Sequence, residues 1–142
     1  MISAIALDIG KKRIGVAGCD GLGLIATGLT TIEHRSFNQT IEQLRQIAQD
    51  RRAEVLVVGL PYLMNGELNQ HALQTQKFAN RLASALQLPI EFVDERLTSY
   101  EAEEQMISQG RSLRHEKGLI DRKAAAIILQ QWLDERRSKL KK

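Results

Sequence analysis

The chain has little of several residue types, and each scarcity excludes a class of protein. Only one of its 142 residues is a cysteine, Cys19, which excludes a disulfide framework and a multi-cysteine zinc site and favours a reducing compartment. No apolar run approaches the roughly 18 residues that a membrane-spanning helix needs. The run from Ile2 to Leu7 has no basic segment before it, so we do not expect a signal peptide. We therefore expect a cytoplasmic protein without membrane contact.

Aromatic residues are also few, and they are scattered along the chain. The six aromatic residues show no alternating pattern of the kind that stacks single-stranded bases. We expect Phe92 and Trp132 to lie in the hydrophobic core. A nucleic acid bound to this protein would then be recognised through its backbone and its shape.

The residues that are present are typical of one folded domain. Hydrophobic residues make up 43% of the sequence and charged residues 26%, and the chain is long enough to bury a core. We assign residues 1–138 to a single domain and residues 139–142 to a basic tail. Residues 1–110 carry ten basic and thirteen acidic side chains, whereas residues 111–142 carry ten basic and four acidic ones. This uneven charge favours a polyanionic partner, with a solvated tail as the simpler alternative.

The hydrophobic pattern predicts the order of strands and helices. Short apolar or alternating segments predict strands, and apolar residues three or four positions apart predict helices. The predicted strands are 3–9, 13–18, 28–32, 54–59 and 90–93, and the predicted helices are 36–52, 69–86, 99–108 and 120–138. Residues 110–119 are expected to form a polar, basic loop. An antiparallel meander followed by alternating helices and parallel strands predicts an α/β three-layer sandwich with a five-stranded mixed sheet.

Asp8 lies near the end of the first predicted strand, on a face made of small side chains. Alternation puts Ala4, Ala6 and Asp8 on one face, so a helix can approach closely and partly bury the carboxylate. An unpaired buried charge is costly, so a positive group must neutralise it. The two candidates are Arg13, across the predicted hairpin, and a metal ion.

Asp94 and Glu95 follow the strand at 90–93, at the end of the sheet where sites form in open α/β folds. If the strand continues, the two carboxylates point to opposite faces, and alternation does not say which of them shares a face with Asp8. The simpler alternative is that one of them pairs with Arg96 or caps the following helix.

Asp121 opens the last predicted helix and shares its apolar face with Ala125, Ile128 and Trp132. One explanation is an acidic residue that is stabilised by the dipole at the start of a helix. The other is that this helix covers the face that carries Asp8 and directs Asp121 toward it.

Three carboxylates that meet at one point would form a site for a hard cation. Oxygen ligands suit Mg²⁺ or Mn²⁺, and two such ions can activate water and stabilise the leaving oxygen of a phosphodiester. The histidines offer no zinc alternative, because His34, His71 and His115 are scattered and are expected at the surface.

Four segments, in this order along the chain, resemble the motifs of the YqgF family, also called RuvX. They are DIGKKRIGVAGCD (8–20), VVGLPYLMNG (57–66), DERLTSYEAE (94–103) and IDRKAAAIILQQWLDE (120–135). This family is similar to the Holliday-junction resolvase RuvC and is assigned a nuclease role in trimming the 5′ end of precursor 16S ribosomal RNA. The resemblance implies a ribonuclease H-like fold for this chain.

The resemblance also implies which acidic residues are catalytic and bind metal. Matched residue by residue, they are Asp8, Glu95 in the DER motif, and Asp121, which would hold two Mg²⁺ or Mn²⁺ ions. In RuvC the second acidic residue lies on the fourth strand, whereas residues 55–58 hold none here, so we expect the geometry of the site to differ.

The activity that the resemblance implies is a metal-dependent endonuclease acting on structured RNA. Its partners would be precursor ribosomal RNA and ribosomal particles. Two alternatives are a Holliday junction resolvase acting on four-way DNA, and a nucleic-acid-binding module without catalysis. The sequence leaves the oligomeric state open.

Basic residues near these acidic residues are expected to contact phosphates. The turn after Asp8 carries Lys11, Lys12 and Arg13, beside which the flanking phosphates of a cleaved strand would pass. An ordinary polar hairpin is the alternative for this turn. A second group flanks the other two acidic residues in the sequence and comprises Arg96, Arg111, Arg114, Lys117, Arg122 and Lys123.

Overall fold

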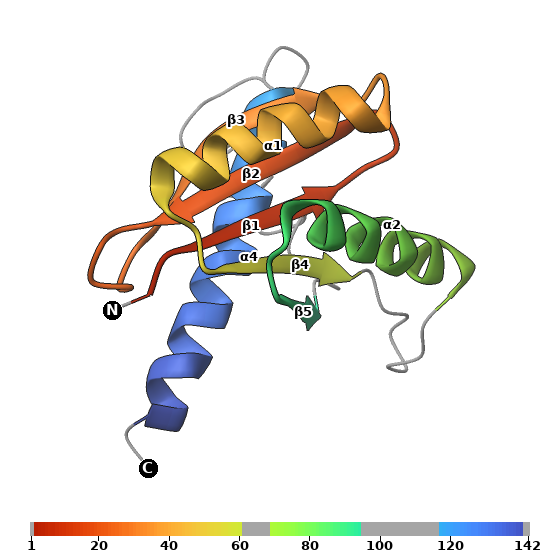
Figure 1. The fold of residues 1–142 in the computed structure, drawn as a ribbon. Helices are drawn as coiled ribbons and strands as arrows, with labels where there is room; N and C mark the ends of the chain where they lie inside the picture. Colours follow the sequence, from red (N-terminus) through yellow and green to blue (C-terminus); the bar gives the residue numbers. More distant parts are fainter. Residues whose placement is uncertain (1, 61–68, 95–116, 141–142) are drawn as a thin grey trace.

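The computed structural model describes residues 2–60, 69–94 and 117–140, in which eight strands and helices follow one another (Figure 1). They are β1 (Ala4–Ile9), β2 (Arg13–Cys19), β3 (Ala26–Glu33), α1 (Phe37–Arg51), β4 (Val55–Leu60), α2 (Gln70–Leu86), β5 (Ile90–Asp94) and α4 (Lys117–Leu140). Each confirms a predicted element, with shifts of a few residues at the ends. The predicted helix 99–108 lies outside the described residues.

The five strands form one mixed sheet in the order β3-β2-β1-β4-β5. The first three strands pair antiparallel as a meander, whereas β4 runs parallel to β1 and β5 runs parallel to β4. This arrangement confirms the predicted sheet. Because β1, β4 and β5 are parallel, their carboxyl ends lie at the same edge of the sheet, where sites form in open α/β folds.

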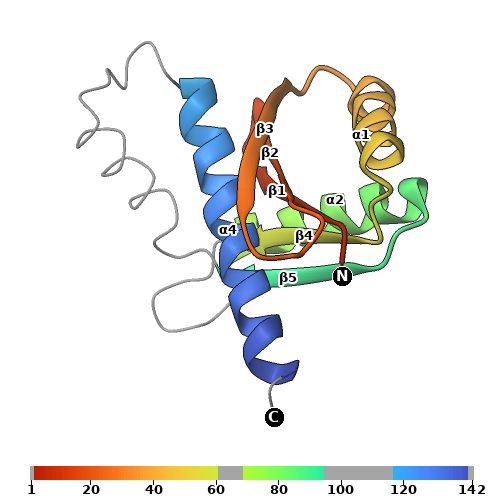
Figure 2. The ribbon, with the colours of Figure 1, turned by 90° about the vertical axis from the view of Figure 1, so that its left-hand side faces the viewer.

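Helices cover both faces of the sheet, with α4 on one side and α1 and α2 on the other (Figure 2). On the α4 side, Ala4, Ala6 and Val57 of the sheet pack with Ala125 and Ile128 of the helix. The opposite face carries larger side chains, among them Ile5, Leu7, Leu44, Leu56 and Leu82. The small residues beside Asp8 therefore let a helix lie close to the sheet, as the alternation in the first strand predicts.

Two glycines bring α4 still closer to the meander. A Cβ atom at Gly15 would lie 1.9 Å from the carbonyl oxygen of Asp121, and one at Gly28 would lie 3.0 Å from the Cβ atom of Arg122. Gly15 is on β2 and Gly28 is on β3. The first half of α4 therefore lies directly against these two strands, in space that any side chain would fill.

Side chains cap the starts of α1 and α2. The hydroxyl of Ser36 accepts a hydrogen bond from the backbone N–H of Gln39 at 3.2 Å, and the side-chain oxygen of Asn69 accepts one from the N–H of Ala72 at 2.7 Å. Each cap satisfies an N–H group that has no partner within the helix. The cap at Ser36 confirms the start that the sequence predicts.

Helix α4 differs from its prediction at both ends. It begins at Lys117, so residues 117–119 of the predicted loop are helical, and it ends at Leu140, so the predicted tail 139–142 starts inside the helix. The physical reason is that the Lys and Leu residues at both ends are good helix formers, so the helix includes these polar segments and also Gly118, despite the low helix propensity of glycine. Neither α4 nor another helix in the described ranges has the length and apolar character that crossing a bilayer requires.

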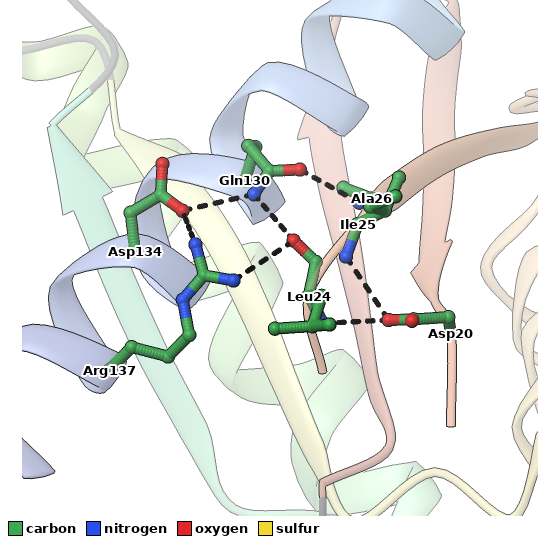
Figure 3. A network of polar contacts seen from close by, with 7 residues as sticks. All are labelled: Asp20, Leu24, Ile25, Ala26, Gln130, Asp134 and Arg137. Carbon is green, nitrogen blue, oxygen red and sulfur yellow. Dashed lines mark hydrogen bonds and ion pairs between the residues drawn. The ribbon is translucent and has the colours of Figure 1, made fainter. Parts of the chain in front are cut away.

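The second half of α4 is fastened to the loop between β2 and β3 (Figure 3). The side chain of Gln130 accepts a hydrogen bond from the N–H of Ala26 and donates one to the carbonyl oxygen of Leu24, both at 2.9 Å. Arg137 donates to the same carbonyl at 3.3 Å and forms an ion pair with Asp134. These contacts fix the direction of α4 across the meander.

Asp20 shapes this loop from within. Its carboxylate accepts hydrogen bonds from the backbone N–H groups of Leu24 at 2.7 Å and Ile25 at 3.1 Å (Figure 3). The N–H groups of Ile25 and Leu24 hold the pKa of the Asp20 carboxyl below its ordinary value, because they stabilise the charged form. Asp20 therefore supports the backbone of a loop that presents Leu22 and Ile25 to solvent.

Replacing Gly15 with alanine should destabilise the protein, because the new methyl group would collide with the carbonyl oxygen of Asp121. We expect the free energy of unfolding to fall by about 1–3 kcal/mol, the usual cost of overpacking. Urea unfolding followed by circular dichroism measures this loss. Gly21→Ala is the matched control, because a Cβ atom there meets nothing within 4 Å. Equal losses in the two variants would contradict the close approach of α4.

Candidate active site

Asp8 lies near the carboxyl end of β1 and faces α4. It is paired with Gly15 in the antiparallel register of β1 and β2, and residues opposite each other in such a pair point to the same face. Since Gly15 lies directly under α4, the half-buried side chain of Asp8 is on the α4 face. The prediction that a helix covers the face of Asp8 is confirmed.

Asp121 lies in the second turn of α4, with its backbone against Gly15. Because Gly15 is the partner of Asp8, the structure brings Asp121 of α4 to the end of the sheet that carries Asp8. The first turn of α4 holds no acidic residue. The alternative in which Asp121 opens the helix and is stabilised there by the dipole is therefore wrong.

Arg13 forms an ion pair with Asp121. Its Nε–H donates to Oδ2 of Asp121 at 2.7 Å, and the side chains are 37% and 21% exposed. From the sequence, Arg13 was a candidate partner for Asp8 and a candidate phosphate contact, and the structure pairs it with a carboxylate 108 residues away. A guanidinium has five N–H donors, so Arg13 can donate to Asp121 and still donate to a phosphate.

Asp94 lies on the other face of the sheet from Asp8. Val93 packs in the cluster under α4, whereas Phe92 packs against the cluster under α1 and α2. Alternation along β5 therefore puts Asp94 on the face of Phe92. Its neighbour Glu95 lies outside the described residues.

The carboxylates at this end of the sheet fit a hard divalent cation. Asp8 and Asp121 supply carboxylate oxygens, which are the ligands that Mg²⁺ and Mn²⁺ prefer. Within residues 2–60, 69–94 and 117–140, no group of three acidic, histidine or cysteine side chains could hold a metal. The two carboxylates are therefore part of the predicted site, and its predicted third ligand, Glu95, lies outside these ranges.

The predicted phosphate contacts that the structure describes are divided between the end of the sheet that carries Asp8 and the opposite half of β3. Lys11 and Lys12 are exposed in the turn between β1 and β2. Arg122 and Lys123 lie beside β3, where they line a cavity of about 440 Å³. Lys117 is the first residue of α4. Three further predicted contacts lie outside the described residues: Arg96, Arg111 and Arg114.

Gly15 is the residue of this site that the sequence analysis missed. It has no functional group, but its missing side chain is what allows the backbone of Asp121 to lie against the strand residue that pairs with Asp8. The available signal was a glycine between two β-branched residues, Ile14 and Val16, inside an apolar strand. A glycine in the interior of a strand often marks the close approach of another backbone.

Comparison with solved structures identifies the class of fold. The chain is similar to T. thermophilus RuvC in complex with a Holliday junction substrate, with a TM-score of 0.57 over 96% of both chains and 12% sequence identity. At this identity the likeness concerns the fold alone. The protein has the ribonuclease H-like fold of RuvC-type resolvases, which confirms the predicted fold class.

The chain belongs to the RuvX family. Residues 2–135 match the family's sequence model, which is described as Holliday junction resolvase. A protein of Gloeothece citriformis (strain PCC 7424) is 66% identical over 137 residues, which cover 96% of this chain and 91% of that protein. A protein of Rippkaea orientalis (strain PCC 8801 / RF-1) is 65% identical over 136 residues, which cover 96% of this chain and 98% of that protein. Both relatives carry the name "Putative pre-16S rRNA nuclease".

A double-mutant cycle should show that Arg13 and Asp121 stabilise each other. We expect a coupling free energy of about 1 kcal/mol from Arg13→Ala, Asp121→Ala and the double variant, because the pair is partly exposed, and a smaller value in high salt. Urea unfolding of the four proteins measures it. The control pair is Arg35 and Glu33, which are 3.2 Å apart but 76% and 68% exposed, with an expected coupling near zero. The same coupling in both pairs would show that the first is an ordinary surface contact.

Proposed function

We propose that this protein is a divalent-metal-dependent endonuclease that cleaves structured RNA, and that it processes the 5′ end of precursor 16S ribosomal RNA. The observation that carries the proposal is the position of Asp8 on the sheet and Asp121 on the covering helix α4, at the edge of the sheet where the parallel strands end. The choice of substrate is supported by the names of relatives such as the one that is 66% identical.

We assign the binding of the metal ions to Asp8, Glu95 and Asp121. Two Mg²⁺ or Mn²⁺ ions would supply the charge that activates water and stabilises the leaving oxygen of a phosphodiester. Because Asp94 lies on the opposite face from Asp8, Glu95 is the one of these two neighbours that we assign to the site. Arg13 keeps the carboxylate of Asp121 oriented toward the sheet, so its position does not depend on the substrate.

Basic residues around the carboxylates are proposed to bind the phosphate backbone of the RNA. Lys11 and Lys12 are exposed beside the carboxyl end of β1, and Arg13 has further donors on the same side. The remaining contacts are assigned to Arg96, Arg111, Arg114, Lys117 and Lys123. Phosphate contacts give affinity without reading the bases, so the shape of the RNA would determine what is bound.

A four-way DNA junction is the second candidate substrate, because the family's sequence model is described as Holliday junction resolvase. The same carboxylates would carry out the same hydrolysis on DNA. Purified protein incubated with precursor 16S ribosomal RNA, a four-way DNA junction and simple duplexes, with Mn²⁺ or with a chelator, distinguishes the candidates. Cleavage of the RNA only with metal supports the proposal, and cleavage of the junction alone supports the second candidate. Binding without any cleavage would indicate a non-catalytic module.

Asp8→Asn should abolish RNA cleavage while leaving RNA binding intact or tighter. The amide removes a charged metal ligand, and it also removes a negative charge that repels the RNA. We expect the single-turnover cleavage rate to fall by about two orders of magnitude or more, with binding followed by gel shift. Asp50→Asn, which changes an exposed carboxylate on α1, is the control and should cleave normally. Normal cleavage by Asp8→Asn would remove this residue from the mechanism.

Replacing Lys11 and Lys12 with alanine should make RNA binding less sensitive to salt. Each lost phosphate contact lowers the slope of log affinity against log salt by roughly one unit, so we expect a decrease of roughly one to two units. Filter binding between low and physiological salt measures the slope. The matched control replaces Arg45 and Lys77, which are exposed on α1 and α2. The same slope in the variant and the wild type would place the path of the RNA elsewhere.

A further inference from the structure

A cavity lies at the same end of the sheet as Asp8, but on the side of α1 and α2. Its volume is about 210 Å³, and it lies beside the turn between β1 and β2. Ile9 and Phe78, which line it, belong to the apolar layer under α1 and α2. Its polar lining consists of Lys11, His34, His71, Gln74 and Thr75.

Each polar side chain described around this cavity can donate a hydrogen bond. Lys11 carries a positive charge, His34 and His71 are imidazoles, Gln74 has an amide, and Thr75 has a hydroxyl. Among the described residues that line the cavity, none is acidic. A set of donors without a carboxylate favours an anion, and phosphate has enough acceptor oxygens to engage several of them at once.

His34 is held in a fixed orientation at this cavity. Its Nδ1 is 2.7 Å from the hydroxyl oxygen of the fully buried Thr40, and its ring meets the edge of Phe78 with centroids 5.1 Å apart. Its backbone N–H donates to the carbonyl of Lys12 at 2.8 Å, which ties it to the turn between β1 and β2. The Nε2 atom has no hydrogen-bond partner within the described chain and is the ring nitrogen that remains for a ligand.

Thr75 provides an independent indication of a ligand. It is only 5% exposed and lines the cavity. Its hydroxyl has no hydrogen-bond partner in the ranges that the structure describes. A buried hydroxyl without a partner is unfavourable, so a ligand that accepts its hydrogen would be stabilised there.

We propose that this cavity binds a phosphate group, and that in the working protein this is a phosphate of the RNA strand. The second part rests on the proposed function. The cavity is smaller than the roughly 300 Å³ of typical small-molecule pockets, which suits one phosphate group. Lys11 lies in the turn that joins β1 to β2, at the end of the sheet and between its two faces. A strand held near Asp8 on one face can therefore reach over this turn to the cavity on the other.

Titration with inorganic phosphate tests the cavity by itself. The NMR signals of the carbon-bound ring protons of His34 and His71 report on it directly, at constant ionic strength with chloride as the replaced ion. We expect both signals to shift and to saturate with one dissociation constant, on the order of 1 mM. Chloride alone should produce no saturable change. Signals that stay in place, or that drift without saturating, would overturn the proposal.

Two variants of α2 test the assignment of the donors. His71→Asn and Gln74→Ala change exposed residues and should each weaken phosphate binding by about tenfold, because one hydrogen bond to a charged acceptor is weakened or lost. Gln70→Ala is the matched control, because Gln70 is exposed on the same helix but does not line the cavity. Circular dichroism checks that all three variants are folded. The same affinity in all variants would place the bound phosphate elsewhere.

Two RNA oligonucleotides that differ only in a 5′ phosphate or a 5′ hydroxyl identify the source of the phosphate. A preference for the 5′ phosphate that disappears in His71→Asn supports a terminal phosphate, and equal weakening of both RNAs in this variant supports a backbone phosphate. RNA binding that His71→Asn leaves unchanged would overturn the RNA part of the proposal. Metal-dependent cleavage without phosphate binding in the cavity would overturn this inference and leave the proposed function intact. Phosphate binding in the cavity without any cleavage would support this inference and overturn the proposed function.

Discussion

The close contact between α4 and the β1–β2–β3 meander sets the geometry of the candidate active site. Gly15 and Gly28 leave room for the helix backbone where side chains would otherwise lie. On the neighbouring strand, the small side chains of Ala4 and Ala6 also allow the helix to pack closely. Because the helix buries its apolar residues in this position, moving it away would expose them to water. The place of the Asp121 backbone is therefore fixed mainly by residues that have no polar side-chain atoms.

The ion pair between Arg13 and Asp121 places a positive charge beside a carboxylate that this packing partly buries. A carboxylate held between a helix and a sheet is partly removed from water and needs a compensating charge. Arg13 lies on β2 two residues before Gly15, so one strand supplies both the space for the helix and the positive charge. A divalent cation at Asp121 would share this carboxylate with the guanidinium or replace it, and the negative charge is balanced in either case.

Local periodicity explains how much of this site could be predicted. The alternation in the first strand predicted the face of Asp8, and the helical spacing after Asp121 predicted the covering helix. The partner of Arg13 could not be predicted in the same way, because the pair joins residues 108 positions apart and charge pairing has no sequence period. The choice between Asp94 and Glu95 depended on which face each residue of β5 occupies, and the packing of its neighbours supplies this only in the folded sheet. The structure starts α4 earlier than predicted, because Lys117 and Leu119 favour a helix although Gly118 and the polar sequence before it favour a loop.

The parts of the site come from stretches of chain that are made at very different times. Arg13 forms an ion pair with Asp121, which is 108 positions later in the sequence, and the N–H of Ala26 donates to Gln130, which is 104 positions later. On the ribosome, the meander is complete long before α4 has been synthesised, and until then its alanine-lined face has no covering helix. The nascent chain consequently cannot bring Asp121 toward Asp8, and the two proposed metal ligands come together only after translation has passed the beginning of α4.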